Sequence, residues 1–393
     1  MCLATSTVPC GTRCDRTFNS TPASRSPLRK SYLDWLRGVA VVIMVGAHVT
    51  DAWTRQEDKT RTLYMYTVFI AGLAAPLFLF LAGLTTSMAA SSRALKVGHA
   101  EAASMARWRG LQVLGLAFLF RLQSQVLGWG AFSNFLKVDI LNVMGVAMMA
   151  AAGLWGLSER RAVRLALFAF ATGLVAMTTP LVREAGVLAM LPDPLEAYIR
   201  PLPGRTNFAL FPWMAFVFGG AIAGELVFAI RDARAEQKLQ AGLLIGGLCG
   251  LAAGYAASFR PSIYPVSNFW TSSPTFFFMR LGYCTAMLPI AWAIDRFHVF
   301  ARTTWSGYFN APDVPGRALT TLGRSSLFVY WIHVEMAYGG ISRPLKRALP
   351  LEWSLAATAA LCAVLYVIVR WKDRTMAGIE LTGALRIFAP VLK

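Results

Sequence analysis

Charged residues are scarce in this sequence. Asp, Glu, Lys and Arg make up 15% of its 393 residues, where an ordinary soluble domain carries about 25%. Acidic residues are the scarcer kind, at 20 against 38 basic ones, while hydrophobic residues reach 56%. This composition excludes an ordinary soluble domain and indicates that the bilayer is the solvent. We therefore expect an integral membrane protein without a sizeable soluble domain.

The signatures of several enzyme and transporter classes are missing as well. The six cysteines and four histidines show no spacing typical of a metal site, and there is no Gly-rich P-loop and no GxSxG nucleophile elbow. Neither a repeat of 20–50 residues nor a pair of matching broken helices occurs, which removes the simplest sequence argument for a secondary transporter. We expect no metal, and we attribute the net charge of +18 to membrane topology and not to nucleic acid.

Long apolar runs are what the sequence has in quantity. Stretches of roughly twenty apolar residues recur along the chain, separated by short basic or Pro/Gly-rich segments. This pattern predicts an all-α polytopic membrane protein with about ten transmembrane helices in one bundle. The predicted spans are Leu36–Trp53, Tyr64–Ala90, Gly110–Leu127, Val138–Leu157, Ala162–Thr179, Phe208–Ile230, Ala241–Ala257, Thr275–Ile294, Leu319–Gly339 and Trp353–Trp371.

The predicted membrane domain covers residues 31–375. We expect residues 1–30 to form a disordered basic tail, because they are rich in Ser, Thr and Arg, and residues 376–393 to form a cytoplasmic tail. If both termini are cytoplasmic, most basic residues fall in segments that face the cytoplasm. The loop around Arg343 is an exception, because its basic residues then face outward. The predicted location is therefore the inner, cytoplasmic membrane.

Three connections between spans are irregular. Leu181–Asn207 and Ser258–Pro274 are too rich in proline to continue a helix, and they are predicted to form a partial lid on the outer side. Asp295–Arg317 is predicted to be an irregular cytoplasmic stretch that covers an opening to the cytosol. Plain linkers are the alternative for all three.

The first span, YLDWLRGVAVVIMVGAHVTDAW, carries the residues most suggestive of chemistry. Arg37 and His48 are almost three helical turns apart, so they lie on one face about 16 Å apart along the axis. Asp51 falls on nearly the same face and is predicted to accept a hydrogen bond from one imidazole nitrogen, which leaves the other as a base. Such a base suits removal of a proton from a hydroxyl or amine. The alternative makes Arg37 a cytoplasmic anchor and His48 an interhelical hydrogen-bond donor.

The ninth span, LGRSSLFVYWIHVEMAYGG, holds a second group of ionisable residues. Arg324 lies near the cytoplasmic side, and His333 and Glu335 lie further out, at a depth like that of His48. In a straight helix Glu335 shares a face with Arg324 while His333 points nearly the opposite way, so the three cannot line one cavity. Tyr330, one turn before His333, is a candidate partner for it. The alternative is a structural Arg–Glu bridge beside a hydrogen-bonded histidine.

Two more arginines, Arg121 and Arg280, lie inside predicted spans. Several buried arginines with few buried acids indicate an anionic guest, because uncompensated charge is costly in lipid and Arg suits phosphate geometry. An interhelical pair between Arg121 and Asp139 is the alternative for the first of them.

Five segments in the same order resemble a known family. They resemble the bacterial relatives of heparan-alpha-glucosaminide N-acetyltransferase and, more broadly, the transmembrane acyltransferase superfamily, and the resemblance runs from about Tyr32 to Trp371. The segments are LDWLRGVAVVIMVGAH, APLFLFLAGLTTSM, VDILNVMGVAMM, FPWMAFVFGGAIAGE and GRSSLFVYWIHVEMAYG.

The resemblance implies transfer of an acyl group, usually acetyl from cytosolic acetyl-coenzyme A, to a hydroxyl or amine of a glycan or glycolipid on the opposite face. Arg37 and His48 match the paired Arg and His in the first helix of polysaccharide O-acyltransferases. Eukaryotic members of the heparan branch tend to have Asn at the place of His48 and a histidine in the following loop. Thr54–Leu63 contains no histidine, so either His48 supplies the base or the chemistry has been lost.

These observations lead to a set of expected roles. His48 and Asp51 are assigned to catalysis, and Arg37, Arg324 and Arg121 to the phosphates of acetyl-coenzyme A, which is a co-substrate. The remaining candidates are assigned to acceptor binding, namely His333, Glu335 and Arg280. The expected partners are the bilayer, the acyl donor and the glycan acceptor, and a homo-oligomer is left open. Two other functions stay open, a transporter or flippase for an anionic lipid or sugar phosphate and an inactive sensor.

Overall fold

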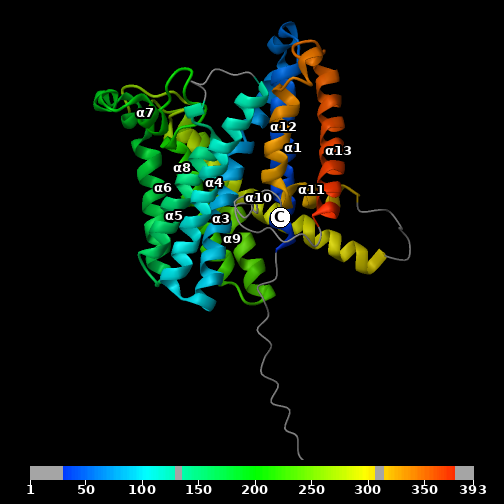
Figure 1. The fold of residues 1–393 in the computed structure, drawn as a ribbon. Coiled ribbons are helices and arrows are strands. Elements are labelled where there is room, and N and C mark those ends of the chain that lie inside the picture. Colours follow the sequence, from blue (N-terminus) through cyan, green and yellow to red (C-terminus); the bar gives the residue numbers. More distant parts are fainter. Residues whose placement is uncertain (1–29, 129–134, 306–313, 377–393) are drawn as a thin grey trace, which may run out of the picture.

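The computed structural model describes residues 30–128, 135–305 and 314–376, and over these ranges the chain is an all-α bundle without a β-strand (Figure 1). The predicted tails fall outside this part, apart from their innermost residues. Each predicted apolar span lies on one or two helices, which confirms the all-α membrane fold. The helices are α1 Ser31–Trp53, α2 Thr62–Ala71, α3 Ala74–Val97, α4 His99–Gly128, α5 Ile140–Gly156, α6 Arg161–Glu184, α7 Asp193–Ile199, α8 Leu210–Ala229, α9 Ala233–Ser258, α10 Pro274–Trp305, α11 Val314–Arg324, α12 Ser326–Tyr338 and α13 Leu351–Thr375.

Length and apolarity identify seven membrane-crossing segments within the described ranges: α1, α2 with α3, α6, α8, α9, the first part of α10, and α13. The other predicted spans are also helical, but their helices are too short or too polar to be identified as membrane-crossing in this way. Helix α5 has 17 residues and α12 has 13, and α4 carries Arg121, Gln123 and Gln125 in its second half.

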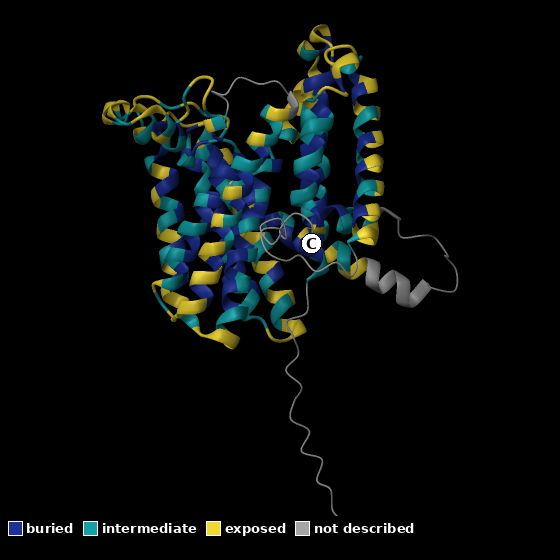
Figure 2. Cartoon of the chain, viewed as in Figure 1, coloured by how far each residue is buried: buried dark blue, intermediate teal, exposed yellow. Residues whose placement is uncertain are grey.

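Many residues of the bundle are exposed along the lengths of the helices (Figure 2), and large apolar residues are among them. Helix α9 buries only Gln240, Gly247 and Gly254, while large apolar residues such as Ile245 and Leu248 on it are exposed. Exposed apolar residues also cover parts of α2, α6 and α13. A soluble protein rarely leaves so much apolar surface uncovered, so these faces are suited to lipid.

Two predicted spans are broken helices. Tyr64–Ala90 divides into α2 and α3 at Gly72 and Leu73. Leu319–Gly339 divides into α11 and α12 at Ser325, whose φ and ψ of −103° and 25° are not helical. The prediction that His333 points away from the face of Arg324 assumed one straight helix. That assumption is wrong, because Arg324 ends α11 and His333 lies on α12.

The irregular connections also differ from expectation. Residues 295–305 continue α10 as a helix, so the predicted irregular stretch Asp295–Arg317 is wrong in its first half. Its second half includes residues 306–313, which lie outside the described ranges. On the other side, the segment 181–207 continues α6 to Glu184 and then forms short helical turns, including α7.

The first and last helices of the chain pack together. Helix α1 lies against α11, α12 and α13, while α3 packs on α8, α4 on α5, and α9 on α10. The crossing of α1 and α11 is close because two glycines face backbone there. A Cβ at Gly38 would overlap the carbonyl of Leu319, and one at Gly323 would overlap the carbonyl of Asp34. Small residues of this kind let membrane helices approach closely.

Candidate active site between α1, α3, α4 and α12

Two histidines from opposite ends of the chain meet inside the bundle. The ring centroids of His48 on α1 and His333 on α12 are 5.0 Å apart. His333 is fully buried, and its Nδ1 lies 2.9 Å from the carbonyl oxygen of Val329. A carbonyl oxygen can only accept, so Nδ1 carries the hydrogen and neutral His333 presents Nε2 as an acceptor.

Both rings have a nitrogen without a hydrogen-bond partner among the described residues. These atoms are Nδ1 of His48 and Nε2 of His333, and both are buried. Buried polar atoms in proteins are nearly always paired, so unpaired ones call for a reason such as catalysis or a ligand. Tyr330, one turn before His333, has its ring 5.7 Å from that imidazole.

Asp51 does not contact His48. Its side chain is 61% exposed, and its Oδ2 accepts a hydrogen bond of 2.9 Å from the Tyr338 hydroxyl. Lys59 lies 3.4 Å from the other carboxylate oxygen. The Tyr338 ring packs edge-on against His48 at 5.4 Å between centroids, so the two predicted catalytic residues are linked only through Tyr338. The expected hydrogen bond is absent here because Asp51, three residues beyond His48, turns toward solvent and Lys59.

A cavity of about 320 Å³ reaches toward the histidines from the side of the bundle where α3 ends and α4 begins. Arg37, Arg93, Arg109 and Arg324 line it, and Tyr330 lines it one helical turn before His333. Apolar side chains form much of the remaining wall, including Met44, Phe78, Leu81, Ile140, Met144 and Met148.

The cavity is elongated. On α3 its lining runs from Arg93 to Phe78, a rise of about 22 Å along a helix. On α1 it runs from Arg37 to Met44, and His48 is one turn beyond Met44. The arrangement suits a long ligand that is anionic at one end and less polar at the other.

A buried carboxylate links two of these arginines. Asp34 is 2% exposed, and its oxygens lie 3.4 Å from Nη1 of Arg37 and 3.6 Å from Nε of Arg324. Arg37 also donates to the Thr85 hydroxyl at 2.9 Å. Arg109 is close enough to Arg93 and Arg37 to feel their like charges. Four guanidinium groups gathered around a cavity form a binding surface for phosphate.

The other predicted donor-binding residue lies elsewhere. Arg121 lines no part of this cavity; its Nη2 forms a 2.7 Å ion pair with Asp139. Asp139 also caps α5, since its Oδ1 accepts from the backbone nitrogen of Ile140 at 2.8 Å. The alternative interpretation, an interhelical pair, is therefore the one that the geometry of Arg121 supports.

The two remaining acceptor-binding candidates are also separate from the histidines. Arg280 lies over the ring of Phe276 at 4.0 Å and near Trp213 at 5.9 Å, beside a recess of about 10 Å³. Its Nε is buried without a partner in the described part of the chain. Glu335 is half-buried near the end of α12, next to Gly339. Neither residue lines the arginine-rich cavity.

Sequence reasoning missed Arg93 and Arg109, which it counted only as loop charges that set topology. A signal was present, because Thr86, Ala89 and Arg93 are spaced at i, i+3 and i+7 and so share one face of a helix. The structure places all three on the cavity wall. An arginine that continues a stripe of small residues points into the bundle, whereas one in a true loop points to solvent.

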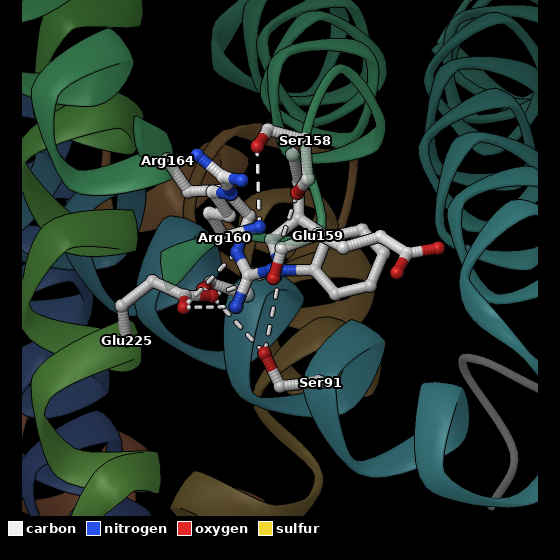
Figure 3. Close-up of polar contacts among 8 residues, drawn as sticks. Ser91, Ser158, Glu159, Arg160, Arg164 and Glu225 are labelled. Atoms are coloured by element: carbon white, nitrogen blue, oxygen red, sulfur yellow. Dashed lines mark hydrogen bonds and ion pairs between the residues drawn. The ribbon is translucent and has the colours of Figure 1, made fainter. Parts of the chain in front are cut away.

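A buried ion pair lies near the connection between α5 and α6 (Figure 3). Glu225 on α8 is fully buried and lies 2.7 Å from Nη2 of Arg164 on α6. Its Oε1 accepts hydrogen bonds from Ser87 and Ser91 on α3 and from the Trp155 indole on α5, at 2.6, 3.0 and 2.8 Å. This cluster joins four helices and shares no residue with the cavity wall, which indicates a structural role.

Comparison with known proteins gives one family match. The family model described as heparan-alpha-glucosaminide N-acetyltransferase, catalytic, matches residues 29–253, more than half of the chain. No curated protein matches the sequence. The matched range contains Arg37, His48, Arg93 and Arg109, and it ends before Arg324 and His333.

Proposed function

Because the chain belongs to the heparan-alpha-glucosaminide N-acetyltransferase catalytic family, we propose that it transfers an acyl group, most simply acetyl, from cytosolic acyl-coenzyme A to a hydroxyl or amine of a glycan or glycolipid on the outer side of the membrane. Both termini face the cytoplasm in this proposal, and the membrane is the inner one. The observation that carries it is the cavity lined by four arginines, whose wall also includes Met44 and Tyr330, each one helical turn before one of the paired histidines.

The donor binds in the elongated cavity. Its phosphates lie against Arg37, Arg93, Arg109 and Arg324, since guanidinium groups pair with phosphate oxygens through charge-assisted hydrogen bonds. Its pantetheine arm runs along the mostly apolar wall, and the thioester reaches Tyr330 and the histidines beyond it. Arg121 has no part in donor binding in this proposal, because its charge is matched by Asp139.

The acceptor approaches from the opposite side, where Tyr338 and the exposed Asp51 lie. His48 removes the proton of the acceptor hydroxyl or amine while that oxygen or nitrogen attacks the thioester carbonyl. The carbon–sulfur bond breaks, a carbon–oxygen or carbon–nitrogen bond forms, and the proton leaves on the thiol of coenzyme A. His333, with Nδ1 hydrogen-bonded to Val329, uses Nε2 to hold the acceptor by accepting a hydrogen bond from it. Tyr338 links Asp51 to His48, since it donates to the carboxylate and packs against the imidazole.

The direct test is acyl transfer from labelled acetyl-coenzyme A in proteoliposomes, with wild type compared to His48→Ala. General-base catalysis contributes a factor of about 10² to 10⁴, so the variant should lose at least about a hundredfold in kcat while it still binds coenzyme A. Equal turnover by both proteins would show that His48 is not the base.

A transporter of an anionic lipid or sugar phosphate would use the same arginines without a covalent step. Stabilisation by coenzyme A separates the two functions, because such a transporter has no reason to bind a thiol-bearing nucleotide. Thermal unfolding of the purified protein with coenzyme A and with a sugar phosphate measures this. A shift with the sugar phosphate alone would favour the transporter.

A further inference from the structure

A second recess, of about 590 Å³, adjoins the arginine-rich cavity along α4. The two share Arg93 and Arg109, so the same guanidinium groups border both spaces. The remaining lining of the second recess comes from one face of α4, spaced at i, i+3, i+4, i+7 and i+11: Glu101, Ser104, Met105, Trp108 and Gln112. A ligand held by the shared arginines can therefore extend into either space.

Trp108 contributes the aromatic surface of this recess. Trp108 is 60% exposed. It neighbours Arg109, which donates to Gln112 at 3.5 Å. Tryptophan is also common at the membrane–water interface, where its ring meets lipid headgroups. The face of α4 that carries Trp108 also bears a carboxylate, a hydroxyl, an amide and a guanidinium group. An exposed indole beside two arginines is a surface on which a flat base can stack next to phosphate.

We propose that the second recess binds the adenine nucleotide end of the acyl donor, with the purine stacked on Trp108 and the phosphates on Arg93 and Arg109. The proposal rests on the proposed function, which places the pantetheine arm in the first cavity. The exocyclic amino group of the purine finds an acceptor in the Glu101 carboxylate or the Ser104 hydroxyl. The donor then bends at the two shared arginines, and each half occupies its own space.

The chain offers a matched control. Trp371, near the end of α13, is 65% exposed. The next residue, Lys372, donates to the Ser325 hydroxyl at 3.0 Å, which places this end of α13 on the same side of the bundle as Arg324. Trp371 lines neither the first cavity nor the second recess. Its replacement removes an exposed indole without touching the proposed site.

The experiment measures binding of adenosine 3′,5′-bisphosphate, a probe without thiol or acyl group, to the full chain in nanodiscs. Trp108→Ala should weaken it about tenfold, because stacking on an aromatic side chain contributes on that scale. Trp108→Phe, which keeps an aromatic face, should recover most of the affinity, and Trp371→Ala should leave it unchanged. An S-acetyl phosphopantetheine fragment should bind equally to wild type and Trp108→Ala.

Equal affinity of wild type and Trp108→Ala for the bisphosphate would overturn the proposal, and so would equal losses in the Trp108 and Trp371 variants, which would reveal two interfacial anchors. The two proposals fail in different ways. Nucleotide binding that depends on Trp108, without any acyl transfer, would support this binding site and exclude the acyltransferase function. Acyl transfer by Trp108→Ala with an unchanged KM for acetyl-coenzyme A would support the acyltransferase function and exclude this binding site.

Discussion

The imidazole of His48 lies beside that of His333, with 5.0 Å between the ring centroids, and each ring has one buried nitrogen without a partner in the described structure. The pair is bordered by Tyr330 toward the arginine-rich cavity and by Tyr338 toward the exposed Asp51. In the proposed reaction the donor approaches the pair past Tyr330 and the acceptor approaches it past Tyr338.

The roles proposed for the two histidines differ, and so do the expected kinetics. His333→Ala should lower kcat/KM for the acceptor by about tenfold, the scale of one hydrogen bond to a substrate. His333→Gln, which keeps an acceptor atom, should recover part of the loss. Steady-state kinetics with the acceptor varied measures this, and the KM for the donor should stay the same. A rise in the KM for the donor alone would instead assign His333 to donor binding.

The arginines at the cavity should affect donor binding, and Arg121 should not. Replacing Arg324 with Gln removes a charge-assisted hydrogen bond to phosphate, so the KM for acetyl-coenzyme A should rise about tenfold with kcat nearly unchanged. Arg121→Gln is the matched control, since it deletes the same group from an ion pair outside the cavity. Equal KM values in wild type and Arg324→Gln would exclude Arg324 from the donor site.

The Glu225–Arg164 pair should be needed for stability. Removing one member of a buried pair leaves the other uncompensated, which costs about 3–5 kcal/mol. Arg164→Met should therefore lower the free energy of unfolding strongly, and Arg164→Met with Glu225→Met should recover much of it. Thermal unfolding in detergent ranks the stabilities of wild type, the single variant and the double variant. A double variant no more stable than the single one would show that the serine and tryptophan contacts of Glu225 matter more than its charge.

The close crossing of α1 and α11 should tolerate no side chain. Gly38→Ala places a methyl group against the Leu319 carbonyl, and overpacking of this kind costs about 1–3 kcal/mol. The shift of α11 should also displace Arg324, so donor KM should rise together with the loss of stability. Gly173→Ala on α6 is the control, because nothing lies near its Cβ. A stable, fully active Gly38→Ala protein would contradict this crossing.

Acid should weaken the contact between the α1–α2 connection and α13. Asp58 accepts hydrogen bonds from Arg55 at 2.9 Å and from the backbone nitrogen of Leu351 at 3.0 Å, and these lower its pKa below the ordinary 3.8. A lowered folded-state pKa gives stability that is present above the unfolded pKa and is lost as pH falls through the folded value.

The measurement is the melting temperature of wild type and Asp58→Asn across the acidic range. Wild type should be the more stable at neutral pH, and the difference should shrink as the pH falls below about 4. A constant difference across this range would mean that the charge of Asp58 has no part in the contact.

The apolar runs were enough to predict the helices, because a bilayer-spanning helix leaves its signature in a single local stretch. The depth shared by His48 and His333 was also predicted from their distances to the span ends. The contacts of these residues were not, since Asp51 turns to Lys59 and the break at Ser325 changes the direction of α12. Neither a tertiary ion pair nor a broken helix is encoded in helical spacing. Arg93 did leave a signal in its spacing with Thr86 and Ala89, but the other walls of the cavity come from helices distant in the sequence.

The site draws on both ends of the chain, with Arg37 and His48 on α1 and Arg324 and His333 on α11 and α12. During synthesis α1 enters the membrane first and has to stay there without these partners until nearly every other helix has followed. A chain halted at the end of the matched range, residue 253, would hold the proposed base and part of the phosphate site without the second histidine. Completion of the proposed site thus coincides with completion of the bundle, so unfinished chains hold that site only in part.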